Sequence, residues 1–291
     1  MSFVEKLGFG CVALSTHLFE HNAVKLLNNV FDQGITHFDT APLYGRGYSE
    51  KIIGKFLKTN RKAVTITTKF GLPVFNNVQL PTTVALPLNF LKNKLRNRPI
   101  SENEFRKPNL LEFRKIDLKE IKFNFENSLK NLDTDYIDNY LLHEALPSFI
   151  TDEGLGYILS LKSKGIVKNI GIAASYPNID LLKLNNIIDW DILQYENSLL
   201  HPSENFINNF PNKKHIYHSI LKPLKHKTFL PNLKNDIAGI LLARATKLNP
   251  NGKSIFASTS INHINHNLKV ADAYNKYSLD EINNILINAI Y

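Results

Sequence analysis

The most informative segment for the fold of this chain runs from Gly34 to Gly45 and reads GITHFDTAPLYG. A short apolar strand ends there at Asp39, and Tyr44 follows in a loop marked by Pro42 and Gly45. The carboxyl ends of parallel strands are where α/β proteins hold their ligands. The stretch therefore predicts a carboxylate and a phenol at the mouth of a parallel sheet.

Two further apolar segments also end in polar side chains. Val64–Lys69 ends in a lysine, and Ile137–Leu142 is followed by His143. In a parallel sheet these ends meet at one edge, so we expect Asp39, Tyr44, Lys69 and His143 to lie together as a catalytic constellation.

Short β-branched segments alternate with helical patterns along the whole chain. A first strand is expected near Phe9–Val12. The other expected strands are Thr36–Asp39, Val64–Lys69, Ile137–Leu142, Val167–Ala173, Ile192–Tyr195, His215–Ile220 and Ser254–Ala257. The expected helices include Tyr48–Leu57, Leu118–Leu132, Thr151–Ser163, Leu233–Leu248, Ile261–Ala273 and Leu279–Ala289. This rhythm predicts an α/β fold, a closed (β/α)₈ TIM barrel, with residues 1–291 forming a single domain.

One stretch departs from the rhythm. Phe70 to Lys115 is rich in Pro, Asn and Lys and shows little periodicity. Loops of this length are commonly functional lids or disordered segments. We therefore expect a long loop after the third strand, rising from the catalytic face.

Composition narrows the classes of function. The chain has 291 residues, 43% of them hydrophobic, and a net charge of +9. It lacks an aromatic and basic nucleic-acid motif, a metal-ligand spacing, and an apolar run long enough to cross a membrane. One cysteine, Cys11, excludes an internal disulfide and suits a reducing compartment. These features predict a cytoplasmic protein without nucleic-acid, membrane or metal partners, in which Cys11 is a small core residue.

The four polar side chains suit carbonyl reduction. A phenol is a weak acid with a pKa of about 10, and a nearby ammonium favours its ionised form. A carboxylate would hold the lysine in place, and a histidine would orient a substrate oxygen toward the phenol. No side chain supplies a hydride, so this chemistry requires a cofactor. Each residue alone has a structural explanation, such as a cap for Asp39, but four at matched strand ends favour catalysis.

Four segments resemble signatures of the aldo-keto reductase superfamily. They are Asp39-Thr40-Ala41-x-x-Tyr44-Gly45, Ser49-Glu50-x-x-x-Gly54, Thr68-Lys69 and Asp138-x-x-Leu141-Leu142-His143. The resemblance runs over nearly the whole chain and implies a (β/α)₈ barrel with NADPH-dependent reduction of aldehydes or ketones. It implies that Tyr44 is the general acid, that Lys69 and Asp39 tune it, and that His143 orients the substrate.

The resemblance also implies contacts to the nicotinamide end of a cofactor. Gln194 corresponds to the glutamine that binds the nicotinamide carboxamide, with Ser175 as a neighbouring contact. His218 takes the place of the aromatic residue beneath the nicotinamide ring, and Ser219 follows it.

The last expected strand is followed by a turn that resembles the family's phosphate-binding turn. Ser258 and Thr259 would supply hydroxyls near a helix N-terminus, and Asn267 would contact adenine. His263 lies in the neighbourhood where the family has a Lys or Arg for the 2′-phosphate, which leaves NADP(H) and NAD(H) both open. A simple helix cap is the alternative for this Ser/Thr cluster.

The leading hypothesis is an NAD(P)H-dependent oxidoreductase that reduces a small aldehyde or ketone, sugar-derived carbonyls included, to the alcohol. The alternative is a non-catalytic cofactor-sensing or regulatory subunit of the same fold, although the complete set of four residues argues against it. We find no paired carboxylates that would favour a hydrolase or isomerase. A monomer or small homo-oligomer is expected.

Overall fold

The computed structural model describes residues 2–72, 80–95, 115–175, 181–182, 187, 189–203, 205–231 and 233–290. Their strands form a closed parallel barrel in chain order, in which the last strand pairs with the first. The strands are β1 Leu7–Gly10, β2 His37–Asp39, β3 Thr65–Phe70, β4 Ile137–His143, β5 Val167–Ala174, β6 Ile192–Glu196, β7 Lys214–His218 and β8 Lys253–Phe256. The predicted TIM barrel is confirmed.

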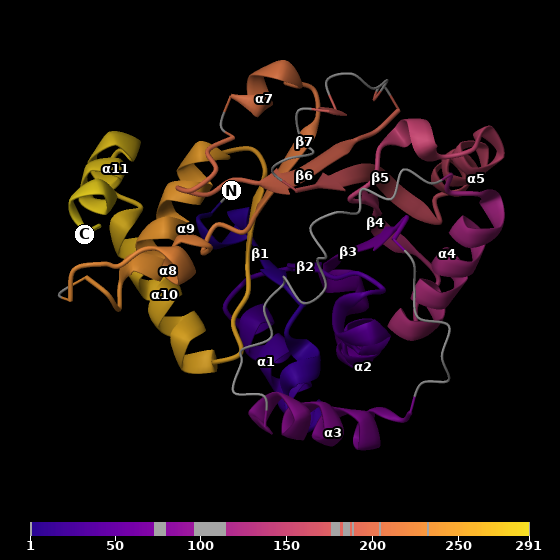
Figure 1. The fold of residues 1–291 in the computed structure, drawn as a ribbon, viewed down its shortest axis with the longest axis horizontal. Coiled ribbons are helices and arrows are strands. Elements are labelled where there is room, and N and C mark those ends of the chain that lie inside the picture. Colours follow the sequence, from indigo (N-terminus) through magenta and orange to yellow (C-terminus); the bar gives the residue numbers. More distant parts are fainter. Residues whose placement is uncertain are drawn as a thin grey trace.

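Helices cover the outside of this ring (Figure 1). They are α1 Glu20–Asp32, α2 Tyr48–Asn60, α3 Thr82–Leu95, α4 Leu118–Leu132, α5 Asp152–Ser163, α7 Phe206–Asn209, α8 Pro223–His226, α9 Ile237–Leu248, α10 Ile261–Tyr274 and α11 Leu279–Asn288. Buried apolar residues of the helices and of the outward strand faces form one large core. None of the helices in the described ranges is long and apolar enough to cross a membrane.

Most element boundaries agree with those predicted to within one residue, and a few differ by more. The first strand lies at Leu7–Gly10, two residues earlier than expected. The seventh ends at His218 because Ser219 adopts a left-handed conformation with φ of 58°, which an extended strand does not allow. The helix expected from Leu233 begins only at Ile237.

The stretch after the third strand is not a loop throughout, because it contains α3. The helix was missed because its apolar residues do not share one face: Ala85 and Leu86 are buried, whereas Val84 and Leu88 are exposed. Pro87 inside the helix also suggests a break, since proline removes a backbone hydrogen bond. Residues 73–79 and 96–114, on which the rest of the lid prediction falls, lie outside the described residues.

The interior of the barrel is layered, because every second residue of a strand points inward. A separate apolar cluster occupies the middle layer and consists of Leu141, Ala173, Ile192, Ile216 and Ile255. Nearer the amino ends of the strands, side chains form a hydrogen-bonded chain that runs His37, Thr67, Asn139, Asn169 and Lys214. Two residues further toward the carboxyl ends lie the polar side chains of the candidate site.

Candidate active site

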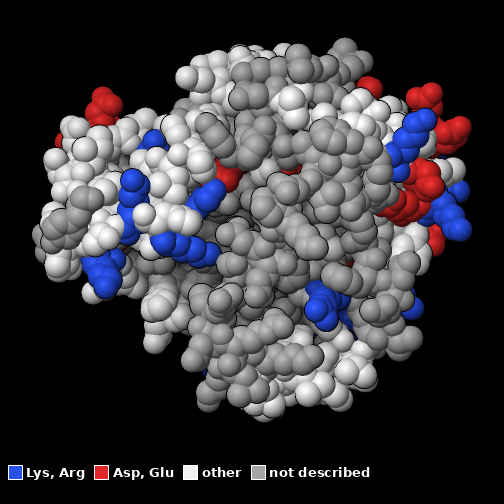
Figure 2. All heavy atoms as spheres, in the orientation of Figure 1, with Lys and Arg blue, Asp and Glu red and all other residues white. Residues whose placement is uncertain are grey.

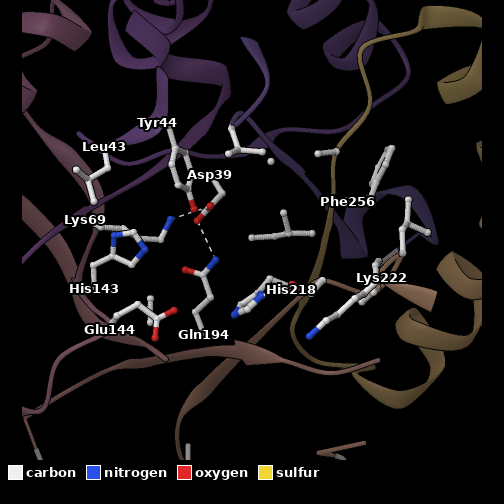
Figure 3. A pocket seen from close by; sticks show the side chains of 18 of the residues that line it. Asp39, Leu43, Tyr44, Lys69, His143, Glu144, Gln194, His218, Lys222 and Phe256 are labelled. Atoms are coloured by element: carbon white, nitrogen blue, oxygen red, sulfur yellow. Dashed lines mark hydrogen bonds and ion pairs between the residues drawn. The ribbon is translucent and has the colours of Figure 1, made fainter. Parts of the chain in front are cut away.

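Asp39 is the centre of the polar layer at the carboxyl ends of the strands. Its Oδ1 accepts a hydrogen bond from Lys69 Nζ at 2.8 Å, and its Oδ2 accepts one from Gln194 Nε2 at 3.0 Å. Lys69 Nζ also donates to the carbonyl oxygen of Thr40 at 2.8 Å. These side chains are nearly inaccessible to solvent, and a buried charge of this kind persists only when it is paired and hydrogen-bonded. The ends of β2, β3 and β6 are thereby linked through one carboxylate (Figure 3).

Tyr44 and His143 line the cavity close to this pair (Figure 3). Their rings lie 6.2 Å apart at 84°, and Lys69 Nζ lies 5.0 Å from the centre of the Tyr44 ring. Tyr44 is placed by a tight turn, in which Gly45 has φ of 58° and packs so closely on Ser15 that a Cβ would overlap it. The structure therefore brings together the four side chains that the sequence assigned to catalysis.

The nicotinamide contacts expected from the sequence divide into two groups. Gln194, His218 and Ser219 line the same cavity as Tyr44. The two ring nitrogens of His218 have different partners. Nδ1 is hydrogen-bonded to Ser219 Oγ at 2.9 Å, and Nε2 lies 3.4 Å from the carbonyl oxygen of Ala174. Ser175 is not in the cavity wall, and its backbone N–H donates to the Glu144 carboxylate at 2.9 Å.

The residues expected to bind the adenosine end lie around the start of α10, after β8. Ser260 caps this helix by accepting from the N–H of His263, and Ser258 Oγ in turn accepts from the N–H of Ser260. His263 is exposed and Asn267 is buried. Thr259 lines a separate hollow between α10 and α1. Both expectations for this cluster, a helix cap and a phosphate-binding turn, are compatible with these contacts, and its cofactor role stays a prediction.

Sequence reasoning missed several residues of the cavity wall. Glu144 directly follows His143 with φ of 55°, and Lys222 and Lys225 follow β7. Lys222 Nζ is paired with Glu196 Oε1 at 2.7 Å. The strand-end signal that found His143 could have found Glu144. Nothing in the sequence pattern distinguishes Lys222 and Lys225 from the chain's other lysines.

Cys11 lies beneath the site and is not one of its reactive groups. The residue is fully buried, and its backbone N–H donates to the carbonyl oxygen of Asp39 at 2.8 Å. Burial raises the pKa of the thiol well above its usual value, and the charge of Asp39 adds to the effect. Cys11 is therefore a neutral core residue.

The cavity suits a nicotinamide better than a metal ion. Gln194 Oε1 is buried and accepts no hydrogen bond from the described residues, so it is free to accept one from a carboxamide N–H. Among the residues that the structure describes, no group of three His, Cys, Asp or Glu side chains is arranged to hold a metal ion.

The fold and site together define a class, a (β/α)₈ barrel with an Asp-Lys-Tyr-His cluster at the carboxyl ends of its strands. The chain belongs to the aldo/keto reductase family, whose model matches residues 6–287.

Individual relatives agree with this assignment. A probable aldo-keto reductase of Glycine max is 30% identical over 180 residues, which are 60% of this chain and 43% of the relative. An uncharacterized oxidoreductase of Bacillus subtilis (strain 168) is 28% identical over 187 residues, which are 64% of this chain and 50% of the relative. An NADH-specific methylglyoxal reductase of Escherichia coli (strain K12) is 30% identical over 174 residues, which are 57% of this chain and 45% of the relative. The chain thus spans about half the length of the curated relatives it matches.

Solved structures show the same fold. A putative aldo-keto reductase from Pseudomonas aeruginosa superposes with a TM-score of 0.64 at 20% identity, covering 93% of this chain and 90% of that one. The holo form of an aldo-keto reductase from Bacillus halodurans superposes with a TM-score of 0.63 at 20% identity, covering 96% of this chain and 91% of that one.

Proposed function

We propose that this chain is an NAD(P)H-dependent oxidoreductase that reduces a small aldehyde or ketone, sugar-derived carbonyls included, to the alcohol. The observation that carries the proposal is the position of Lys69, whose ammonium bonds Asp39 and lies 5.0 Å from the Tyr44 ring. Family membership supports the same reaction class.

Each side chain has a distinct part in this reaction. The Tyr44 phenol donates its proton to the substrate oxygen, and the Lys69 ammonium stabilises the negative charge that develops on the phenol oxygen. Asp39 fixes the position of Lys69. His143, across the cavity, hydrogen-bonds the substrate oxygen and directs it toward Tyr44. A bound nicotinamide dinucleotide would supply the hydride.

The cofactor would be held by two parts of the cavity. Gln194 and His218 would contact the nicotinamide, and Lys222 and Lys225 would attract the negatively charged phosphates. Lysine and arginine side chains also gather over the part of the surface around α8 and α9 (Figure 2). The exposed His263 lacks the guanidinium fork with which an arginine binds a phosphate. Titrations with NADP(H) and with NAD(H) test which of the two cofactors this chain prefers.

The Tyr44→Phe variant tests the proposal. We expect turnover of aldehydes to fall by at least about 100-fold, because a general acid contributes roughly 10²–10⁴-fold, while the affinity for NAD(P)H stays within about twofold. Turnover is followed by oxidation of NAD(P)H with a panel of aldehydes and sugars, and binding by fluorescence titration.

The matched control is Tyr48→Phe. The Tyr48 hydroxyl donates to the carbonyl oxygen of Leu80 at 2.9 Å, outside the cavity, so this variant should keep its activity. Equal turnover in Tyr44→Phe and the unsubstituted protein would contradict the role of Tyr44. Tight cofactor binding with no turnover of any carbonyl by the unsubstituted protein would favour a cofactor-sensing subunit instead.

A further inference from the structure

The first turn of α2 is tied to the strand ends beside it by buried side-chain hydrogen bonds. Ser49 Oγ donates to the carbonyl oxygen of Cys11 at 2.8 Å and lies 2.9 Å from Thr40 Oγ1. Glu50 Oε1 accepts from Thr68 Oγ1 at 2.7 Å. All five residues are fully buried, so solvent water does not compete for these bonds. The turn is thereby linked to the chain after β1, to the chain after β2 and to β3.

The direction of the bond between Ser49 and Thr40 follows from their hydrogens. A hydroxyl group has one hydrogen to donate, and Ser49 gives its own to Cys11. Thr40 must therefore be the donor, and Ser49 Oγ accepts from it. On the other side, the N–H of Thr40 donates to the carbonyl oxygen of Thr67 at 2.8 Å. Thr40 is thus held between α2 and β3.

Thr40 in turn holds the Lys69 ammonium. Its carbonyl oxygen accepts from Lys69 Nζ at 2.8 Å, and Asp39 accepts a second bond from the same nitrogen (Figure 3). An ammonium group has three N–H bonds in a tetrahedral arrangement, so two fixed bonds also determine the direction of the third. Because Lys69 is only 2% exposed, its position depends on these two acceptors.

The same helix is joined to Tyr44 through the chain. The turn Tyr44–Gly47 leads directly into α2, whose second residue is Ser49. Ser49 is therefore connected to Tyr44 along the backbone and to Lys69 through two successive hydrogen bonds. Lys69 Nζ lies 5.0 Å from the centre of the Tyr44 ring, and the effect of a charge on its neighbour depends on their separation. Ser49 thus links the two groups whose separation matters.

We propose that Ser49 is a positioning residue for proton transfer, which holds the Lys69 ammonium beside Tyr44 through Thr40. Ser49 and Thr40 are not among the residues that line the cavity, so their effect on the reaction passes through Lys69. This inference rests on the proposed function, because it needs Tyr44 to donate the proton.

The Ser49→Ala variant tests the inference through the pH dependence of carbonyl reduction. Reduction needs the protonated phenol, so its rate falls when Tyr44 loses its proton at high pH. A less firmly held Lys69 stabilises the phenolate less. The midpoint of the fall should therefore move upward by about 0.5 pH unit or more, part of the 1–3 units that a neighbouring opposite charge contributes.

The same variant should separate kcat from binding. We expect kcat at neutral pH to fall by about two- to tenfold, as for the loss of one hydrogen bond. KM and the affinity for NAD(P)H, measured by fluorescence titration, should stay nearly unchanged, because Ser49 does not line the cavity.

Thr40→Val removes the donor of the same hydrogen bond and should give the same changes. Because both substitutions break one link, their effects on kcat should not add in the double variant Ser49→Ala/Thr40→Val. Thr40→Ser keeps the hydroxyl and should recover most of the rate. The matched control is Thr246→Val, since the buried Thr246 hydroxyl donates to the carbonyl oxygen of Ala243 within α9. Its loss should leave the midpoint unchanged.

The possible results separate this inference from the proposed function. An unchanged midpoint and kcat in Ser49→Ala overturn the role of Ser49 and leave the proposed function intact. A lower kcat without a shift of the midpoint indicates a merely structural effect and is equally contrary. No turnover of any carbonyl by the unsubstituted protein overturns both proposals. If Ser49→Ala does not fold, Thr40→Val supplies the same readout.

Discussion

Lys69 neutralises the charge of Asp39 in a part of the barrel that water hardly reaches. The two residues are 2% and 3% exposed, and their ion pair measures 2.8 Å. Removing one partner of a buried pair leaves an uncompensated charge, which is far more destabilising than removing both.

The Lys69→Met variant should therefore lower the free energy of unfolding by about 3–5 kcal/mol. The double variant Asp39→Asn/Lys69→Met should be destabilised less than Lys69→Met alone, because no charge is left unpaired. Chemical denaturation of both variants measures this difference. Equal destabilisation in the two would indicate that the pair is not the source of the effect.

The polar residues of the site were predictable from the sequence to different degrees. Asp39, Lys69 and His143 each end or directly follow an apolar run, and the geometry of a parallel barrel brings such positions together. Glu144 follows His143 at the same strand end and could have been found in the same way, but its left-handed backbone and its hydrogen bond to Ser175 could not. Such features arise from the conformation of the loop and leave no periodic trace.

At the scale of single elements, β5 is closely enclosed by β4 and β6 at Gly171. A Cβ added to Gly171 would lie 2.5 Å from Leu141 Cδ2 and 2.6 Å from the carbonyl oxygen of Ile192. Because one of these atoms belongs to the backbone of β6, the clash cannot be relieved by a side-chain rotation.

The Gly171→Ala variant should destabilise the barrel by at least about 1–3 kcal/mol, the usual result of overpacking a core. The control is Gly156→Ala, at an exposed position within α5 where an added Cβ meets no atom within 4 Å. That variant should stabilise the protein by about 0.5–1 kcal/mol, because alanine favours the helix. Thermal unfolding of both proteins measures these changes. We expect the two substitutions to change the stability in opposite directions. An unchanged stability in Gly171→Ala would contradict the close packing of β5.

The elements themselves were largely visible in the sequence because buried parallel strands are short continuous apolar runs. Ile137–His143 and Ile192–Glu196 each extend the predicted strand by only one residue. The helix α3 was not visible, since its buried and exposed apolar residues are mixed around its axis. Periodicity detects helices that have one apolar face, and α3 does not.

On the scale of the whole molecule, the polar layer at the amino ends of the strands links stability to pH. His37 is fully buried in this layer, and burial lowers its pKa to about 3, with the nearby ammonium charges of Lys253 and Lys69 contributing. In the unfolded chain its pKa would be about 6.5. Because the unfolded state binds the proton more readily, the contribution of His37 to stability is complete above about pH 6.5 and is lost progressively as the pH falls toward 3.

The free energy of unfolding should therefore fall as the pH is lowered from 6.5 to 4, with His37 contributing a slope of up to about 1.4 kcal/mol per pH unit. Burial also lowers the pKa of His17 and His215, and both act in the same direction. Burial raises the pKa of Glu50, so Glu50 acts in the opposite direction. The contribution of His37 is obtained by comparing the slopes of urea unfolding for the unsubstituted protein and His37→Gln. We expect a shallower slope in His37→Gln and an unchanged one in the exposed His226→Gln; equal slopes in all three would contradict the assignment.

The two hydrogen bonds accepted by Asp39 have a consequence for how such a barrel can diverge. One oxygen bonds Lys69, to which we assign a part in proton transfer, and the other bonds Gln194, to which we assign a cofactor contact. A substitution of Gln194 that adapts the protein to another cofactor would also remove a ligand of Asp39 and disturb Lys69. Under the proposed function, changes of cofactor selectivity would therefore be accepted more readily around Lys222, or outside the cavity at the exposed His263, than at Gln194, where selection for binding and selection for rate would act on the same carboxylate.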